Sequence, residues 1–226
     1  MSYAIVLGAL GCGLMGLGAQ QGWPGGVMVW LGADLLALSV AHAVGGHGLS
    51  GKRADGTIPG WSRVVFLPLM LVLETVWRIW RFGSREPAIS RVNDWLAVGS
   101  RPRGGEGYEA FDVVVDLTAE VEDPSSIRRK MGYRPFPILD GSSPDEEALR
   151  RFLRSLAGER LFVHCAQGHG RTGLVAAALL IERGTARTPE EAIHILRQAR
   201  PKIAVNAIQR KCLDAYHASR GSSNGL

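Results

Sequence analysis

The chain has 226 residues, 46% of them hydrophobic, and a formal net charge of +5 at pH 7. That length allows one domain of ordinary size and an additional segment, and the apolar content with 29 glycines indicates that this segment is not a second soluble domain. Three cysteines without paired spacing argue against a disulfide framework, so the soluble part is expected in a reducing compartment. The positive charge suits a protein that lies against anionic lipid, and nothing in the sequence resembles a nucleic-acid-binding module.

Two long apolar segments open the chain. Tyr3–Ala19 carries no charge and Val27–Val44 carries only Asp34, so each approaches the roughly 20 apolar residues that cross a bilayer. With QQGWPGG as the turn between them, they predict a transmembrane hairpin over residues 1–47 of an integral membrane protein. A secretory signal peptide is the alternative for the first segment, but signal peptides begin with a basic region, which is missing before Tyr3.

Two features inside the hairpin need an explanation. Small residues recur every fourth position at Ala4, Gly8, Cys12 and Gly16, a ladder that either lets two membrane helices approach closely or simply reflects a glycine-rich segment. Asp34 lies in the second segment, where an uncompensated charge costs about 2.5 to 3.5 kcal/mol. We expect Asp34 to lie near a helix end or to have a packing partner, and a functional role stays open.

Residues 48–88 combine a basic loop with a third apolar stretch. Val64–Leu73 is short for a membrane span, contains Pro68, and continues into a segment that places Glu74, Arg78 and Arg81 on one helical face. This pattern predicts an interfacial helix, and a third transmembrane helix is the alternative. With two spans, the basic residues on both sides of this helix share one side of the membrane, which favours a catalytic domain on the cytoplasmic side.

Residues 89–218 have the pattern of one α/β domain, and residues 219–226 are predicted to be a flexible tail. Four apolar segments are predicted as strands: Trp95–Ser100, Phe111–Thr118, Tyr133–Leu139 and Leu161–Cys165.

Three helices are expected in the same domain, in addition to the one that begins after the last predicted strand. Capping boxes, in which Ser143 precedes Glu146 and Thr188 precedes Glu191, mark two helix starts. A further helix is predicted from Asn206 to about His217.

The segment after the last predicted strand carries the candidate chemistry. The strand ends at Cys165, a short loop follows, and Arg171 opens a helix; the loop residues are Ala166, Gln167, Gly168, His169 and Gly170. Backbone N–H groups of such a loop can point inward, and a helix N-terminus adds about half a positive charge, which predicts a binding site for a phosphate-sized dianion. The same field favours thiolate over thiol at Cys165, which makes it a candidate nucleophile.

Two side chains at the start of the helix complete this arrangement. The planar guanidinium of Arg171 can hold two phosphate oxygens and stabilise the charge that develops in the transition state. The hydroxyl of Thr172 can stabilise the cysteine sulfur when a second step expels it.

This pattern resembles the signature of the cysteine-dependent protein tyrosine and dual-specificity phosphatases: His164, Cys165, five residues, Arg171 and Thr172. The resemblance covers most of Ile89–His217. RVNDWLAVGSRP and FDVVVDLTAE resemble early strands of dual-specificity phosphatases, and RPKIAVNAIQRKCLDAY resembles the closing segment of the branch that includes the mitochondrial lipid phosphatases. It implies their fold, a mostly parallel sheet flanked by helices, and a reaction through a phosphocysteine intermediate that needs neither a metal nor another cofactor.

The resemblance also implies a general acid on a mobile loop before the cysteine strand. Asp140 in FPILDGSSP matches that place, and Gly141 gives the loop freedom to move. Asp116 is the rival, although its position in a predicted strand favours a strand-end role. The residue that matches His164 in the family supports the cysteine loop by hydrogen bonding, which implies the same role here.

Other polar residues near the loop admit two interpretations each. His169 either adds positive charge for a more anionic substrate or is an exposed residue without a role in selectivity. Gln209 either helps to place the hydrolytic water or lies on a helix surface. The basic run Arg128–Lys130 is either a solvated face or, with Arg101 and Arg103, a surface that orients the site on anionic lipid. The same two interpretations apply to Arg200 and Lys202.

The predicted function is that of a membrane-anchored, dual-specificity type phosphatase that acts on phosphorylated proteins. A phospholipid head group, such as phosphatidylglycerophosphate or a phosphoinositide, is the alternative substrate, because tethering raises the effective concentration of either class. Membrane lipid is the other expected partner, and the oligomeric state is left open.

Two remote alternatives complete the set. A sulfurtransferase of the rhodanese type has a shorter loop and needs no aspartic acid. A non-catalytic phosphate-binding module usually lacks the cysteine, the arginine or the acid, and all three are present here.

Overall fold

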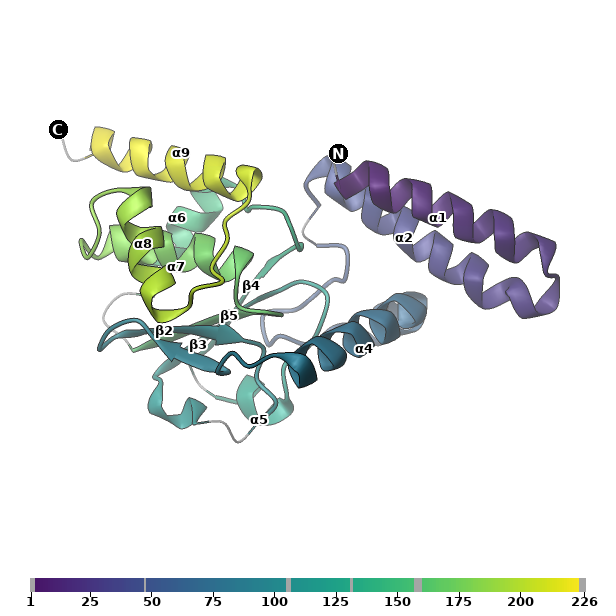
Figure 1. Ribbon diagram of the computed structural model, residues 1–226, viewed down its shortest axis with the longest axis horizontal. Helices are drawn as coiled ribbons and strands as arrows, with labels where there is room; N and C mark the ends of the chain where they lie inside the picture. Colours follow the sequence, from purple (N-terminus) through teal and green to yellow (C-terminus); the bar gives the residue numbers. More distant parts are fainter. Residues whose placement is uncertain (1–2, 47, 105–106, 131, 157–159, 224–226) are drawn as a thin grey trace. The chain divides into compact units, whose positions relative to one another are not determined.

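The structure is a computed structural model that describes residues 3–46, 48–104, 107–130, 132–156 and 160–223. The chain divides into two compact units, shown as a ribbon in Figure 1. The first unit comprises Met1–Arg53, Thr57–Ser84 and Ala119–Glu122, and the second comprises Ala54–Gly56, Arg85–Thr118 and Asp123–Leu226.

The first unit begins with a helical hairpin. Helix α1 (Tyr3–Gln20) and helix α2 (Gly26–Val44) are joined by the 3₁₀ turn η1 (Trp23–Gly25). Their axes approach closely where glycines meet, because a Cβ at Gly11 would lie 2.7 Å from the carbonyl oxygen of Gly32. At the other end of the interface the hydroxyl of Ser39 donates to the carbonyl of Ala4 over 2.7 Å.

The predicted ladder of small residues is half correct. Gly8 lies against Ser39, but Cys12 is exposed and a Cβ at Gly16 would meet open space. The contact line on α1 instead passes through Ala4, Gly8, Gly11, Met15 and Gly18. These positions alternate steps of four and three residues, which keeps one helix face on its neighbour, whereas a strict step of four drifts away from it.

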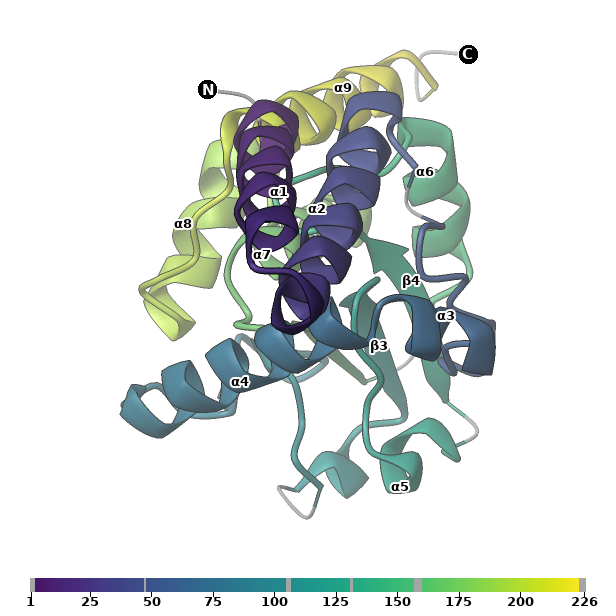
Figure 2. The ribbon, with the colours of Figure 1, turned by 90° about the vertical axis from the view of Figure 1, so that its right-hand side faces the viewer.

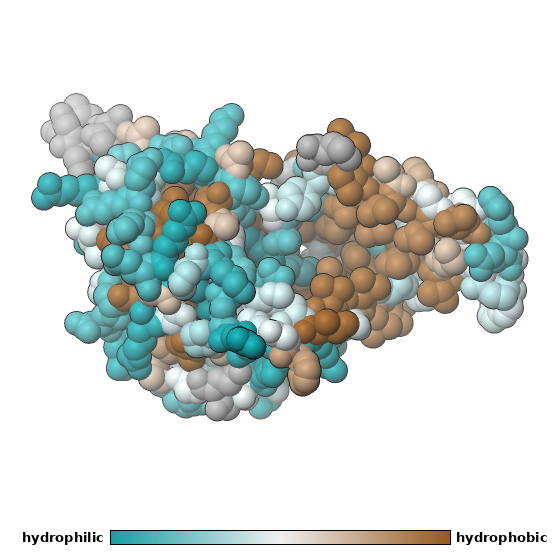
Figure 3. Space-filling model, in the orientation of Figure 1, coloured by the Kyte–Doolittle hydropathy of each residue, from teal (hydrophilic) through white to brown (hydrophobic). Residues whose placement is uncertain are grey.

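The outer surface of the hairpin is apolar. Tyr3, Ile5, Leu10, Leu17 and Val40 are all more than half exposed, and this surface is brown in Figure 3. Of the helices within the described residues, Tyr3–Gln20 and Trp23–Val44 are long and apolar enough to cross a membrane.

Asp34 has the packing partner that was expected for it. Helix α3 (Gly60–Val65) leads into helix α4 (Leu67–Gly83), and the backbone N–H of Leu69 donates to Asp34 over 3.3 Å. Phe66, which precedes α4, offers no side-chain cap, so the carboxylate from α2 takes the place of a cap for the N–H of Leu69 in the first turn. Trp30, one turn earlier on α2, donates from its indole nitrogen to the carbonyl of Val65 over 2.7 Å. In Figure 2, α4 runs across α1 and α2 rather than alongside them.

The first unit also holds a short piece of the chain from far along the sequence. The carbonyls of Ala119 and Val121 accept hydrogen bonds from the side chains of Ser50 and Lys52. The carboxylate of Glu122 accepts from the backbone N–H of Ile58 over 2.5 Å and from the guanidinium of Arg63 over 2.6 Å. Ala119–Glu122 is thus held at several points by the segment that follows the hairpin.

A five-stranded sheet forms the centre of the second unit, with the order β1-β2-β5-β3-β4. The strands are β1 (Ile89–Arg91), β2 (Leu96–Ser100), β3 (Val113–Thr118), β4 (Tyr133–Ile138) and β5 (Leu161–Cys165). All pairs are parallel except β1 with β2. The four predicted strands and the mostly parallel sheet are confirmed, and β1 was missed because three residues are too few for a visible pattern.

Each face of the sheet buries its own apolar cluster. Alternate residues of β5 point to opposite faces, so Val163 and Cys165 join the larger cluster and Phe162 joins the smaller one. In Figure 1 the helices α6 (Glu146–Arg154), α7 (Gly170–Glu182), α8 (Pro189–Ala199) and α9 (Ala207–Ser223) lie on one side of the sheet. The turn η2 (Tyr108–Ala110) and helix α5 (Ser125–Arg128) belong to the other side.

The capping predictions for the helices need correction. Helix α6 begins later than predicted, with Asp145 rather than Ser143 as its N-cap, and the Asp145 carboxylate accepts from the N–H of Ala148. Thr188 does cap α8, but its expected partner Glu191 accepts from the N–H of Arg187. A box that the sequence reading missed opens α9, where Asn206 and Gln209 bond reciprocally to each other's backbone N–H.

Helix α9 is also longer than predicted. It continues to Ser223, so most of the predicted flexible tail is helical, and residues 224–226 lie outside the described residues. Arg220 fastens this last part to the end of α7, because it donates to the carbonyl of Glu182 over 2.8 Å.

Candidate active site

The candidate site lies at the carboxyl edge of the parallel strands, where ligands commonly bind in open α/β sheets. Strand β5 ends at Cys165, and its neighbour β2 ends at Ser100, which is paired with Cys165. Asp140 follows the end of β4. Three strands therefore deliver their following loops to one place.

The loop after Cys165 folds back over the sulfur. Cys165 is 3% exposed, and the backbone N–H of Gly168 donates to its Sγ over 3.3 Å. Gly168 has φ +78°, and a Cβ there would lie 2.2 Å from the carbonyl oxygen of Gly99 in β2. Only glycine allows this path, because both the left-handed backbone and the contact with the strand exclude a side chain.

One buried arginine binds two carbonyls of the loop and so directs them away from the candidate site. Arg200 is 1% exposed and donates over 2.9 Å to each of three carbonyls, those of Gln167, Gly168 and Pro87. Because a trans peptide places C=O and N–H on opposite sides, the amides of Gly168 and His169 must point away from Arg200. This orientation is the one that the predicted phosphate-binding loop requires. The idea that Arg200 meets lipid is wrong, because its side chain is buried.

Arg171 projects from the first turn of α7. It is 2% exposed, and its Nη1 donates to the carbonyl of Ile138 at the end of β4 over 2.9 Å. Its Nη2 lies 3.1 Å from Oδ1 of Asp140. The structure therefore joins the predicted anion-binding arginine to the predicted acid, whose side chain is 76% exposed and open to a substrate.

The loop that carries Asp140 is tied to the start of α9. The amide of Asn206 donates to the carbonyl of Gly141 over 2.8 Å, and that of Gln209 donates to the carbonyl of Ser142 over 3.2 Å. Gln209 is 2% exposed, so its predicted alternative as a surface residue is wrong. A Cβ at Gly170 would lie 3.0 Å from Oε1 of Gln209, which places this amide between the acid loop and the cysteine loop.

Asp116, the rival acid, has no access to a substrate. It is fully buried, and its Oδ1 accepts from the backbone N–H and the hydroxyl of Thr118 over 2.8 and 2.7 Å. Its Oδ2 accepts from the hydroxyl of Tyr133 over 2.5 Å. Burial and the Asp116 charge raise the pKa of Tyr133, so the phenol keeps its proton and its bond. The strand-end role expected for Asp116 agrees with these contacts.

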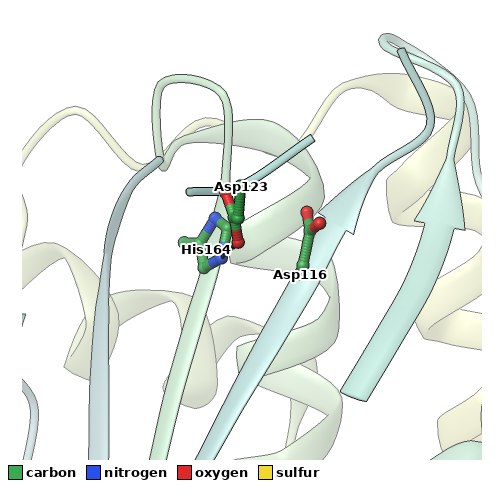
Figure 4. A group of neighbouring side chains, drawn as sticks. All are labelled: Asp116, Asp123 and His164. Atoms are coloured by element: carbon green, nitrogen blue, oxygen red, sulfur yellow. Dashed lines mark ion pairs between the residues drawn. The ribbon is translucent and has the colours of Figure 1, made fainter. Parts of the chain in front are cut away.

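His164 pairs with a residue that the sequence reading did not single out. Its Nε2 lies 3.0 Å from Oδ2 of Asp123, and both side chains are fully buried. Figure 4 shows the two side chains directed toward each other, with Asp116 nearby on β3. Complete burial opposes a charge on His164, but the attraction of Asp123, together with smaller attractions from Asp116 and Cys165, raises the pKa of His164.

These three side chains also have a composition that metals accept. Donor atoms of Asp116, Asp123 and His164 lie within 4.8 Å of one another. The group does not suit an ion, however, because both oxygens of Asp116 already accept hydrogen bonds and Asp123 already faces the imidazole.

His169, inside the loop, turns toward Glu86. Its Nε2 lies 2.8 Å from Oε2 of Glu86, and its side chain is 16% exposed, so the predicted exposed alternative is wrong. Arg200 and Lys202 approach the same carboxylate to 3.7 and 3.8 Å. Burial opposes the charge of Glu86, but these donors hold its pKa below the usual value. Burial lowers the pKa of His169 despite Glu86.

The remaining predicted residues line the same loop. The carbonyl of Ala166 accepts from the backbone N–H of Arg101 over 3.2 Å, Gln167 is exposed, and Gly170 begins α7. Thr172 is fully buried, and within the residues that the structure describes its hydroxyl has no hydrogen-bond partner. The hydroxyl can therefore donate a hydrogen bond to the sulfur of Cys165, as predicted, without giving up another hydrogen bond.

Comparison with known proteins identifies the class. Residues 92–217 match the family model described as PTP-SAK, the DSP-PTPase phosphatase domain of Swiss Army Knife proteins. The chain belongs to this family, within the dual-specificity and tyrosine phosphatases, a class of phosphoric monoester hydrolases.

Curated relatives are similar over part of their length. "Putative tyrosine phosphatase 197R" of Invertebrate iridescent virus 6 is 34% identical over 47% of this chain and 46% of the relative. Cyclin-dependent kinase inhibitor 3 of Rattus norvegicus is 34% identical over 38% of this chain and 47% of the relative. The chain spans about half the length of these relatives.

Solved structures share the fold. The active form of Tk-PTP is 26% identical, with a TM-score of 0.51, and the match covers 58% of this chain and 97% of that one. PTPMT1 in complex with PI(5)P is 19% identical, with a TM-score of 0.52 over 61% of this chain and 99% of that one. The predicted dual-specificity-phosphatase-like fold is confirmed.

Proposed function

We propose that this protein is a membrane-anchored phosphatase that hydrolyses phosphomonoesters on proteins through a phosphocysteine intermediate. The observation that carries the proposal is the cysteine loop, in which the Gly168 amide donates to Cys165 Sγ over 3.3 Å, with Arg171 joined to Asp140 over 3.1 Å beside it. Membership in a phosphatase family supports the same residues.

In the first step Cys165 attacks phosphorus as the thiolate. A sulfur–phosphorus bond forms, the bond from phosphorus to the leaving oxygen breaks, and Asp140 gives its proton to that oxygen. The inward amides of the loop and the guanidinium of Arg171 hold the other phosphate oxygens, where charge is concentrated in the transition state.

In the second step water attacks the phosphocysteine. Asp140, now a carboxylate, takes the proton from water, phosphate forms, and Cys165 leaves as a thiolate that Thr172 stabilises. The amide of Gln209, buried beside Gly170 and the acid loop, is the candidate for placing this water.

The first unit supplies the proposed attachment to the membrane. Residues 1–47 form the transmembrane hairpin, and residues 48–88 add a basic loop and the interfacial helix α4, with the catalytic domain at 89–218 on the cytoplasmic side. The exposed apolar surface of α1 and α2 supports this assignment. Helix α4 supports it too, because Leu71, Val76 and Ile79 are more than half exposed while Glu74 and Arg78 form an ion pair.

A phospholipid head group is the second candidate substrate, favoured by the membrane attachment. PTPMT1, which shares the fold, was crystallised with PI(5)P. His169 weighs against a polyanionic lipid, because its ring is engaged by Glu86 and burial lowers its pKa. We therefore rank phosphoproteins first.

The test is phosphate release by the full chain in detergent micelles. A phosphotyrosine peptide, a phosphothreonine peptide, phosphatidylglycerophosphate and phosphoinositides are compared under one condition. Cys165→Ser should abolish release, and Asp140→Asn should lower it by about a hundredfold to ten-thousandfold.

Cys212→Ser is the matched control for the nucleophile. Cys212 is also buried, but it lies in α9 and its thiol donates to the carbonyl of Pro144. Hydrolysis that survives Cys165→Ser at the wild-type rate would refute the proposed function. Faster turnover of one lipid than of any peptide would replace the phosphoprotein with that lipid as substrate.

A further inference from the structure

A buried ion pair lies directly behind the candidate nucleophile. His164 and Cys165 are consecutive residues of β5, so their side chains point to opposite faces of the sheet. The His164 ring stacks on Phe162, with ring centroids 5.4 Å apart, in the smaller apolar cluster. On the same face Asp116 of β3 is paired with His164 and accepts from the Tyr133 hydroxyl, so the imidazole belongs to a small buried polar group at the edge of this apolar cluster.

Asp123 is the group that makes a charged imidazole possible. Its Oδ2 lies 3.0 Å from Nε2 of His164, and neither side chain has any exposed surface. A buried cation without a counter-ion would give up its proton. With Asp123 in place, the pKa of His164 is raised although burial opposes the charge.

The other titratable groups around His164 leave Asp123 as its main counter-ion. Asp116, from β3, adds a weaker attraction, and its oxygens are already engaged by Thr118 and Tyr133. Arg101 Nε lies 3.9 Å from the other carboxylate oxygen of Asp123. Cys165 is the last charged partner of His164, and its attraction also raises the pKa of His164.

The attraction between His164 and Cys165 acts in both directions. If a thiolate at Cys165 favours the imidazolium, the imidazolium favours the thiolate to the same extent, because the interaction energy is shared. Loss of the Asp123 carboxylate removes the reason for the positive charge, and with it the support for the thiolate.

We propose that Asp123 is a positioning residue that acts on Cys165 through His164, keeping the imidazole protonated and fixed behind the end of β5. This inference rests on the proposed function, in which the Cys165 thiolate attacks phosphorus. Asp123 touches neither the substrate nor the reacting atoms, and its part is to maintain the charge that prepares the nucleophile.

The test measures the reactivity of Cys165 without a substrate. Alkylation of the full chain by iodoacetamide in detergent micelles is followed against pH, with the peptide that contains Cys165 quantified by mass spectrometry. Asp123→Asn should move the pH of half-maximal alkylation upward by about one unit, so that Cys165 reacts about tenfold more slowly at a pH below that midpoint. Asp123→Glu, which restores a carboxylate, should recover part of the shift.

Asp112→Asn is the matched control. Asp112 also holds a cation, Arg160, over 2.9 Å, but this pair lies on the exposed surface at the opposite end of β5. It should leave the Cys165 alkylation profile unchanged. An unshifted midpoint in folded Asp123→Asn protein would overturn the proposal.

A measurement on the wild-type protein keeps the proposal open to refutation if Asp123→Asn does not fold. Nitrogen NMR of the His164 ring, followed against pH, should show the imidazolium persisting above the ordinary imidazole titration near pH 6.5, and a ring that loses its charge at or below that pH would overturn the proposal. Phosphate release is scored separately. A protein that hydrolyses nothing but shows the Asp123-dependent shift would contradict the proposed function and leave the ion pair established.

Discussion

The two units of this protein distribute polar and apolar groups in opposite ways. In the hairpin, apolar side chains such as Leu10 and Leu17 are more than half exposed, and glycines fill the interior. In the catalytic unit, Ile208 is the one large apolar side chain that is mostly exposed among the described residues, whereas Arg171 and Arg200 are buried. The difference supports the proposed attachment of the protein to a membrane through the hairpin.

Glycine illustrates the same contrast. At Gly11 and Gly32 the missing side chain lets two helices touch. At Gly168 it lets a loop pass over a strand in a left-handed conformation, with φ +78°. In the first case glycine serves packing, and in the second it serves the candidate chemistry.

The prediction with the largest expected effect is Gly168→Ala, which tests whether the path of the loop over β2 is needed for catalysis. The added Cβ would lie 2.2 Å from the Gly99 carbonyl oxygen, so the loop must shift away from β2 and from Cys165. We expect phosphate release to fall about a hundredfold or more, because small displacements of reacting groups have effects of that size. Gly184→Ala is the matched control, since Gly184 has φ +70° and open space around it. Both variants lose roughly 1 kcal/mol of stability to backbone strain, and only the first should lose activity.

Leu10→Arg tests whether the exposed apolar surface of the hairpin lies in a membrane. Leu10 is 55% exposed near the middle of α1, where an arginine in a bilayer costs about 2.5 to 3.5 kcal/mol. Sedimentation with membranes should decrease. Ile208→Arg, at a position 54% exposed in the catalytic unit, should leave it unchanged. Equal behaviour of the two variants would contradict a membrane location for the hairpin.

Glu122→Gln tests whether the contacts between Ala119–Glu122 and the rest of the first unit contribute to the stability of the protein. The carboxylate of Glu122 accepts from Ile58 and Arg63, and a charged acceptor of this kind contributes about 1 to 2 kcal/mol when partly exposed. Thermal unfolding should detect that loss. Glu74→Gln, which breaks the exposed pair with Arg78, should cost less than about 0.5 kcal/mol.

The smallest expected effect is a pH dependence of stability. The pKa of His164 is raised by folding, so its contribution is complete below the unfolded pKa near 6.5 and is lost as pH rises through the native pKa. The pKa of Tyr133 and that of Cys212 are raised as well, but their contributions change only near pH 9 to 10 and above. Melting temperature should therefore decline as pH rises above about 6.5 in wild type and stay flatter in Asp123→Asn. Equal slopes in the two proteins would contradict this prediction.

The features that sequence reasoning found are those with a local pattern. The buried strands are continuous apolar runs, and the loop after Cys165 has a fixed spacing to Arg171. Asp140 was placed by the resemblance to the phosphatases, whose general acid lies on a loop before the cysteine strand, and the structure puts its side chain beside Arg171. These signals depend on neighbours in the chain, so they are visible without a fold.

The features that it missed depend on contacts between distant segments. Asp123 lies far from His164 in sequence, and Glu86 lies far from His169, so neither pair has a local signature. Arg200 looked like a surface residue because a buried arginine is recognisable only by the carbonyls that it meets. The start of α6 was misplaced because Ser143 and Asp145 are both good caps, and the choice depends on where the preceding loop ends.

Each unit contains a short segment from the sequence range of the other, Ala119–Glu122 in the first and Ala54–Gly56 in the second. These two segments determine which truncated chain keeps its contacts. A chain shortened to residues 85–226 keeps Ala119–Glu122 but loses Ser50, Lys52, Ile58 and Arg63, which hold that segment. It also loses Gly56, which leaves room for the Tyr133 ring, since a Cβ there would lie 2.5 Å from Cε1. A start just before Ser50, after α2 has ended at Val44, removes the hairpin and keeps these contacts. That longer fragment is the one expected to fold and crystallise without α1 and α2.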